Sequence, residues 1–107
     1  MVESPFDAEI RVGEVLSAEA FPETNKPEMV KLRIDLGGET VQSAAQLGYN
    51  HDPAELPGRQ VLCATGLGTV RIAGFESEAL TVGVPDDDGR PVLVTPDREV
   101  PLGGRQY

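Results

Sequence analysis

The stretch VKLRIDLGGETVQSAAQL, residues Val30 to Leu47, decides the fold class of this 107-residue chain. Its first half alternates apolar residues at 30, 32, 34 and 36 with charged residues at 31, 33 and 35. A period of two is that of a strand with one buried face. A short glycine turn follows, and the second half then places Val41, Ser43 and Ala45 on one face. We therefore expect a hairpin of two strands, the second with a crowded or ligand-facing surface of small residues.

Short strand patterns continue on both sides of this hairpin. EIRVGEVLSAEAF (9–21) alternates, breaks phase at Gly13-Glu14 and resumes, which predicts a long strand bent by a bulge. RQVLCAT (59–65) reads as a mostly buried strand, and GLGTVRIAGFE (66–76) as a glycine-punctuated loop. SEALTVGV (77–84) alternates Leu80, Val82 and Val84 with smaller residues, and PDDDGR (85–90) predicts a hairpin turn leading into PVLVT (91–95).

Only two segments carry helix-start signals, and both are short. In SPFDAE, Ser4 is placed as an N-cap before a proline, and in HDPAELPG, Asp52 is placed in the same way before Pro53. Each predicts a single helical turn. Short strands without a long helix to cover them hide their edges by closing on themselves. The fold class expected is all-β, a small antiparallel barrel of the oligonucleotide/oligosaccharide-binding (OB) type.

Composition favours one non-catalytic domain over residues 1–107. The chain is 39% hydrophobic and 25% charged, as in a soluble globular protein, and it contains no window of about 18 apolar residues that would cross a membrane. Because it also lacks a secretion signal, we expect it in the cytoplasm. With one cysteine, Cys63, and one histidine, His51, no zinc-ligand set or disulfide is expected, and we expect no cofactor. We interpret Cys63 as a small core residue and His51 as a surface or cap residue rather than a catalytic pair.

The net charge of −9 has two interpretations. The acidic residues are an interaction surface, or they adapt the whole surface to a salty, halophilic cytoplasm. They are spread from Glu3 to Glu99, apart from Asp86-Asp87-Asp88, which we interpret as a turn and not a calcium loop. The spread favours salt adaptation. In concentrated salt a nucleic-acid binder gains little from counterion release and relies on shape, stacking and hydrogen bonds.

Several of these stretches, taken in order, resemble the CsaA family of secretion-associated, chaperone-like proteins within the tRNA-binding-domain superfamily. They cover roughly residues 6–103: EIRVGEVLSAEAFPETNKPEMVKLRIDLG, QSAAQ, PAELPGRQVLCAT, VRIAGFESEALTVGVPDDDG and LVTPDREVP. The resemblance implies an OB-fold core and terminal segments that build a symmetric homodimer. It also implies binding of tRNA or of extended polypeptide across the barrel face.

The resemblance also assigns residues. The superfamily pattern of a basic residue, Ile, any residue, Gly, two residues, Ser, two residues and Met or Leu matches Arg71, Ile72, Gly74, Ser77 and Leu80. In related tRNA binders the serine and the last hydrophobic residue line the nucleic-acid surface, so Ser77 and Leu80 inherit that role as an expectation. The family's Gln-Ser-Ser-Ala-Gln segment reads QSAAQ here, from Gln42 to Gln46.

The remaining candidate site residues each have a structural alternative. Arg71 contacts phosphate or a peptide carboxylate, or forms a salt bridge with Glu76 or Glu78. Phe75 stacks on a base, or plugs the end of the barrel. Lys31 and Arg33 form a small basic stripe, or simply a solvated strand face.

The polar residues Gln42, Ser43 and Gln46 offer hydrogen bonds to a ligand, or make ordinary cross-strand bonds. Three functions follow from these candidates. The first is non-catalytic tRNA binding on the barrel face. The alternatives are an export-related chaperone that holds unfolded precursor peptides and a trans-acting partner of a tRNA synthetase.

Overall fold

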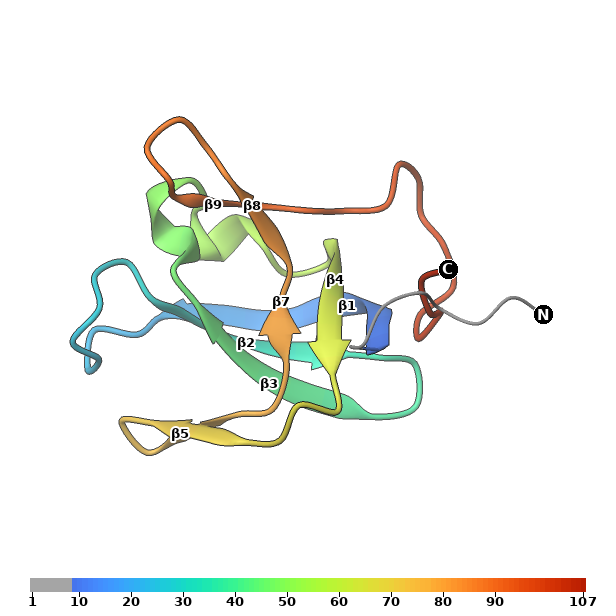
Figure 1. The fold of residues 1–107 in the computed structure, drawn as a ribbon, viewed down its shortest axis with the longest axis horizontal. Helices are drawn as coiled ribbons and strands as arrows, with labels where there is room; N and C mark the ends of the chain where they lie inside the picture. The colour runs from blue at the N-terminus through green and yellow to red at the C-terminus, as the bar shows by residue number, and fades with distance from the viewer. Residues whose placement is uncertain (1–8) are drawn as a thin grey trace.

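A computed structural model describes residues 9–107 and shows an antiparallel β-structure (Figure 1). Five strands form the main sheet in the order β3-β2-β1-β4-β7, and β5-β6 and β8-β9 form two further hairpins. The elements are β1 (Glu9–Ala20), β2 (Val30–Asp35), β3 (Thr40–Ala45), η1 (Leu47–Tyr49), η2 (Pro53–Glu55), β4 (Gln60–Thr65), β5 (Val70–Ile72), β6 (Phe75–Ser77), β7 (Leu80–Thr81), β8 (Gly83–Pro85) and β9 (Pro91–Leu93).

The two edge strands of the main sheet, β3 and β7, meet each other. Thr81 Oγ1 donates a hydrogen bond to Ser43 Oγ at 2.9 Å, and the backbone N–H groups of Glu78 and Ala79 both donate to the carbonyl of Gln42, at 2.8 and 3.2 Å. The sheet is therefore a nearly closed barrel, as the OB-type prediction requires, and its edges are shielded from pairing with other chains.

The hairpin predicted from Val30 to Leu47 is confirmed, with β2 and β3 paired in register from Val30↔Ala45 to Asp35↔Thr40. All four apolar residues of the β2 pattern are buried, and they join side chains from most other elements. The core cluster consists of Val15, Val30, Leu32, Ile34, Leu36, Leu47, Leu56, Val61, Cys63, Ala79 and Leu93. Cys63 is thus the core residue that the sequence predicted.

Strand β1 is long because it pairs with two different strands along its length. Residues Glu9–Glu14 pair with β4, and Glu14–Ala20 pair with β2. The predicted bulge exists, but its predicted position at Gly13-Glu14 is wrong, since the register shifts between Val15 and Ser17 and leaves Leu16 as the extra residue. Gly13 is required for another reason: a Cβ there would collide with the side chain of Ile34.

Two predictions for the second half of the chain are also wrong. Residues 66–76 are not all loop, because β5 and β6 form a hairpin in which Ile72 pairs with Phe75 across Ala73 and Gly74. Both turn residues have positive φ, 47° and 83°, as the tightest hairpin turns need. In addition, the predicted single strand over residues 77–84 is divided among β6, β7 and β8, and Leu80 and Val84 are both exposed.

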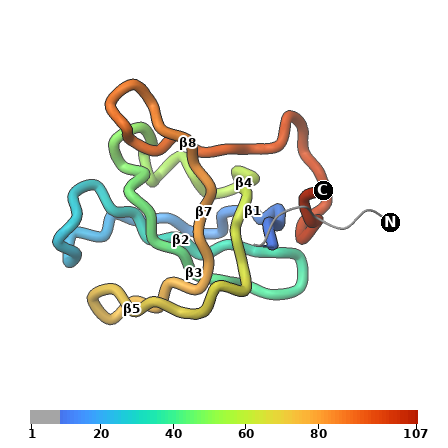
Figure 2. Tube along the Cα trace, viewed as in Figure 1, coloured from blue at the N-terminus to red at the C-terminus, as the bar shows by residue number. Residues whose placement is uncertain are grey.

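The connecting segments hold the barrel at both ends. The side chain of Asp52 accepts a hydrogen bond from the Ala54 N–H at 3.0 Å, which confirms the predicted cap of η2, whereas the predicted turn at Ser4 lies outside the described residues. The chain after β9 crosses back to β1, where Gly103 N donates to Val12 O at 2.8 Å (Figure 2). Within residues 9–107, no helix is long and apolar enough to cross a membrane.

Candidate functional site

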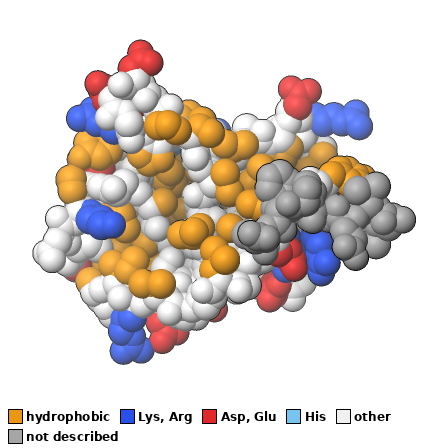
Figure 3. Space-filling view, viewed as in Figure 1, with side chains coloured by type: hydrophobic (Ala, Val, Ile, Leu, Met, Phe, Trp, Pro, Cys, Tyr) orange, Lys and Arg blue, Asp and Glu red, His pale blue; other side chains and the backbone are white. Residues whose placement is uncertain are grey.

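An apolar groove of about 360 Å³ lies between β3, the β5–β6 hairpin and β7. Three large apolar side chains stand on its rim largely in water: Leu67 is 52% exposed, Val70 60% and Leu80 58%. Figure 3 shows hydrophobic side chains gathered on this face of the molecule. The residues lining the groove are Lys26, Met29, Ala44, Ala45, Gln46, Leu67, Gly68, Val70, Ile72, Ser77, Glu78, Ala79 and Leu80. Clustered exposed apolar surface of this kind marks a binding site more often than chance exposure.

The alternation of the β5–β6 hairpin builds one wall of this groove. Successive residues of a strand point to opposite faces, so Val70, Ile72 and Ser77 reach the groove while Arg71 and Glu76 point away from it. Arg71 and Glu76 are cross-strand partners, and their Nη2 and Oε1 atoms form a salt bridge of 2.9 Å. Arg71 therefore makes the ion pair that was its structural alternative, on the outer face of the hairpin.

Phe75 fastens the tip of the hairpin to the sheet. Its ring meets that of Phe21 edge to face, with centroids 5.5 Å apart, and Lys31 Nζ lies 5.1 Å from the Phe21 centroid and 5.9 Å from that of Phe75. Lys31 also forms a salt bridge of 3.3 Å with Glu19. An edge-to-face pair adds about 0.5–1.5 kcal/mol beyond its burial, and a cation over the rings adds about as much. Phe75 and Lys31 thus fix the hairpin that walls the groove.

The polar candidates of β3 are engaged within the protein. Gln42 Nε2 donates to Glu76 O at 3.0 Å, and Gln46 Nε2 donates to Pro27 O at 3.1 Å. Ser43 is fully buried, and its hydroxyl accepts the bond from Thr81. Each of these bonds joins β3 to another segment, so this strand organises the groove through its side chains.

Ser77 and Leu80, the residues that the sequence pattern singles out, both line the groove. The Ser77 hydroxyl accepts from Ala44 N at 3.3 Å and donates to Ala79 O at 3.4 Å, so it ties β6 to β3 at the groove floor. Leu80 projects from the edge strand β7 into the opening.

The structure brings Gln46, Ser77 and Leu80 together in the groove. The groove lining does not include Arg71, Phe75, Lys31 or Gln42; Ser43 lies inside the barrel, and Arg33 lies on the exposed surface of β2.

Sequence reasoning missed several lining residues, among them Lys26, Met29, Leu67 and Val70. Two signals pointed to them. Leu67 and Val70 are apolar residues in a segment otherwise rich in glycine and threonine, and Lys26 is one of only two lysines in the chain.

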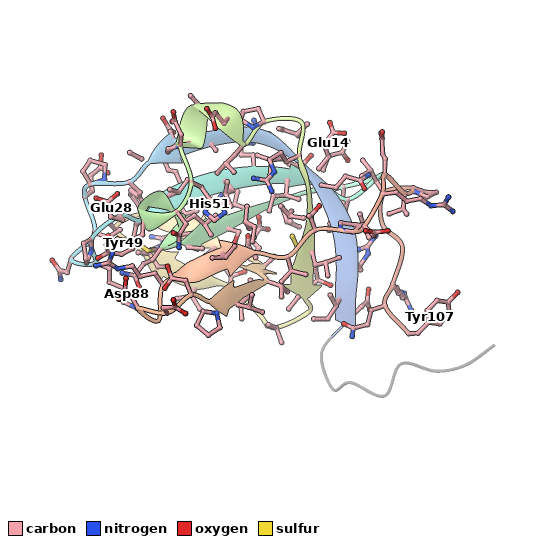
Figure 4. All side chains as sticks on the ribbon, turned by 90° about the horizontal axis from the view of Figure 1, so that it is seen from above. Glu14, Glu28, Tyr49, His51, Asp88 and Tyr107 are labelled. Atoms are coloured by element: carbon pink, nitrogen blue, oxygen red, sulfur yellow. The ribbon has the colours of Figure 1, made fainter. Side chains whose placement is uncertain are left out.

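His51 and Cys63 both have structural roles. His51 Nδ1 lies 3.0 Å from Leu47 O and its Nε2 accepts from Leu93 N at 3.4 Å, so the ring bridges η1 and β9 with the proton on Nδ1 (Figure 4). Cys63 is fully buried, and burial raises the pKa of its thiol to about 12. A thiol held in its neutral form is a poor nucleophile. Among the residues that the structure describes, no cluster of His, Cys, Asp or Glu could hold a metal ion.

The acidic run Asp86-Asp87-Asp88 forms the predicted hairpin turn. Asp86 Oδ1 accepts from the N–H groups of Asp88 and Arg90, both at 2.9 Å, while Oδ2 accepts from Asn50 Nδ2 at 3.0 Å. The bond from Asn50, followed by that from the Arg90 backbone, holds the pKa of Asp86 below its usual value of 3.8. Arg90 also lies over the Tyr49 ring, 4.2 Å from its centroid, at the end of the molecule where Tyr49 and Asp88 meet in Figure 4.

Comparison with known proteins places the chain in a known architecture. Residues 10–105 match the family described as "Putative tRNA binding domain". The crystal structure of the chaperone CsaA from Bacillus anthracis is 35% identical, with a TM-score of 0.81 over 94% of this chain and 90% of that one. The CsaA chaperone protein from Picrophilus torridus is 32% identical, with a TM-score of 0.84 over 94% of this chain and 92% of that one.

The curated relatives are larger proteins. Methionine–tRNA ligase from Methanothrix thermoacetophila is 39% identical in an alignment of 103 positions that covers 92% of this chain. The chain spans about 15% of the length of such ligases, so the resemblance concerns a small part of each.

Proposed function

The chain belongs to the tRNA-binding domain family, and from this premise we propose that it is a non-catalytic, CsaA-like protein that binds tRNA in the groove between β3, the β5–β6 hairpin and β7. One observation carries the proposal. Ile72, Ser77 and Leu80, which belong to the superfamily pattern, are separated in sequence yet line the same groove. Its apolar walls suit an unstacked base, which proteins that read RNA loops and ends bind by contact with the base face.

The charge of the protein determines how such binding works. Arg11, Lys31, Arg71 and Arg105 are each paired with a glutamate, and the net charge is −9. Of the other basic residues that the structure describes, only Lys26 lines the groove, so affinity rests mainly on apolar and hydrogen-bonding contacts there and falls little as salt rises. This fits the interpretation of the acidic surface as an adaptation to concentrated salt.

Truncating the groove side chain Leu80 tests the proposal. Leu80→Ala should weaken binding of unfractionated tRNA about tenfold, because about 1–2 kcal/mol of apolar contact is lost. Val84→Ala is the matched control, since Val84 is similarly exposed but does not line the groove. Fluorescence anisotropy at moderate and at near-saturated KCl gives both affinities. No tRNA binding by the folded protein at either salt concentration contradicts the proposal.

A second candidate function is a chaperone that holds extended polypeptide in the same groove. The exposed Leu67, Val70 and Leu80 favour it, because apolar side chains of an unfolded client would fill such a groove without charge. Two of the solved structures it resembles bear the word chaperone in their titles. If this function holds, the protein delays aggregation of an unfolded client and Leu80→Ala reduces that effect more than Val84→Ala does.

The resemblance to CsaA proteins extends the proposal to a homodimer built by the terminal segments. Light scattering at high salt measures the association state directly, and a monomer under those conditions would contradict the proposed homodimer. The relation to methionine–tRNA ligases adds a third candidate, action in trans beside a tRNA synthetase.

A further inference from the structure

The groove continues into a second hollow. A pocket of about 480 Å³ lies between the β1–β2 loop and the segment 48–53, and it shares Lys26 and Met29 with the groove. Its lining mixes apolar groups, such as the Phe21 ring, with the polar side chains of Thr24, Asn25, Lys26 and Glu28. A ligand that fills the groove can therefore extend past Lys26 into a neighbouring site of different chemistry.

Lys26 stands at the junction of the two hollows with its charge uncompensated. Its side chain is exposed, and among the described residues its ammonium group forms no salt bridge, whereas Lys31, the other lysine, is paired with Glu19. One carboxylate lines each hollow. Glu78 in the groove accepts a hydrogen bond from Gln42 N at 3.0 Å, and Glu28 lines the second pocket.

The backbone that carries Lys26 is held in place. Thr24 Oγ1 donates to Lys26 O at 3.0 Å and lies 3.3 Å from Lys26 N, which donates to it. Gln46 anchors the next residue by its bond to Pro27 O. Only the side chain of Lys26 must be ordered when a ligand binds, which keeps the entropic cost of the contact low.

We propose that Lys26 binds a backbone phosphate of an unpaired RNA strand whose neighbouring bases occupy the groove and the second pocket. This rests on the function proposed above and specifies its ligand: single-stranded segments rather than duplex. The apolar groove suits the face of one base, and Asn25 and Thr24 in the second pocket can bond the edge of the next. Paired RNA hides its base faces in the stack and is held through several phosphate contacts, whereas Lys26 is the one basic residue among the described ones that lines either hollow.

The salt dependence of binding tests the phosphate contact. The probe is a labelled single-stranded RNA of about eight nucleotides, within the site size of one OB fold. Between about 0.05 and 0.2 M KCl, Lys26→Gln should reduce the slope of log K against log[KCl] by about 0.7, the value for one phosphate of a single strand. Lys26→Arg should retain the slope.

Arg59→Gln is the matched control, because it removes the same charge from an exposed residue that lines neither hollow. Its slope should equal that of the unsubstituted protein. A blunt duplex of the same sequence should bind at least about tenfold more weakly than the single strand.

The possible outcomes separate the two proposals. If tRNA and the single strand bind but Lys26→Gln leaves the slope unchanged, the phosphate contact is overturned while tRNA binding stands. Equal affinity for duplex and single strand overturns the assignment to unpaired RNA. Failure of the folded protein to bind either RNA, with capture of an unfolded polypeptide instead, overturns both. Thermal melting of each variant shows that it is folded.

Discussion

Strands β2 and β7–β8 show the same alternation of apolar residues but bury them differently. In β2, Val30, Leu32 and Ile34 are at most 1% exposed, whereas Leu80 and Val84 are more than half exposed. β2 lies between two strands over its whole length, while β7 pairs with β4 through only two residues. The alternation of apolar residues thus shows only that a segment forms a strand. The neighbouring strands determine which face of that strand is buried.

The reversal in β7 follows from the closure of the barrel. Ala79 and Ser77 point inward, where the backbone of β3 approaches closely enough for Ala79 N to bond Gln42 O. Leu80, the next residue along the chain, is 58% exposed and lines the groove.

The largest expected effect comes from truncating one apolar side chain in each region. Ile34→Ala should lower the free energy of unfolding by about 2–5 kcal/mol, because it leaves a cavity in a fully buried site. Leu80→Ala should change it by less than about 0.5 kcal/mol, as at an ordinary surface position. Urea denaturation measures both. Equal losses would show that Leu80 belongs to the core and would end the distinction between the two regions.

The sequence predicted the first region well and the second only in part. Alternation and a glycine turn suffice for β2 and β3 because both strands have one face in the core, so pattern and burial agree. The β5–β6 hairpin escaped prediction because its strands are three residues each and Ala73 occupies a turn position with positive φ, where glycine or asparagine is the usual signal.

The residues of the candidate site were likewise predicted only in part. Ser77 and Leu80 were found through a family pattern, since exposure and groove geometry depend on where β3 and β7 meet and leave no local trace in the sequence. Lys26 was missed because its place in the lining of both hollows depends on how the loop between β1 and β2 folds. Pairing of Lys31 with Glu19 and of Arg71 with Glu76 can be seen only in three dimensions.

A smaller effect on the stability of the fold is expected from ionisation of the buried Cys63 thiol. The pKa of Cys63 is about 12 in the folded protein, against an ordinary value of 9.0. Below pH 9.0 the thiol is neutral in both states, so stability does not depend on it. As the pH rises from 9.0 toward 12, only the unfolded chain loses its proton, and stability should fall.

Urea midpoints at about pH 8 and about pH 10.5 measure this fall, since they bracket the ordinary thiol range. Cys63→Ala is the control, because the other groups that titrate there are unchanged in it. In the native protein a thiol reagent should label Cys63 only as fast as the barrel opens. Rapid labelling without unfolding would place β4 among the loosely held elements.

The smallest expected effect on stability comes from Asp86, in the turn that joins β8 and β9. Because hydrogen bonds from Asn50 and from the backbone lower the folded-state pKa of Asp86, its contribution to stability is present above pH 3.8 and is lost as the pH falls through the lowered value. Asp86→Asn should remove this acid-side dependence, and Asp87→Asn, a neighbouring exposed carboxylate, should leave it intact. Chemical shifts of the Asp88 and Arg90 amide groups, both bonded to Asp86, follow the transition during an acid titration. If those shifts move while the urea midpoint does not, the hairpin opens independently of the barrel.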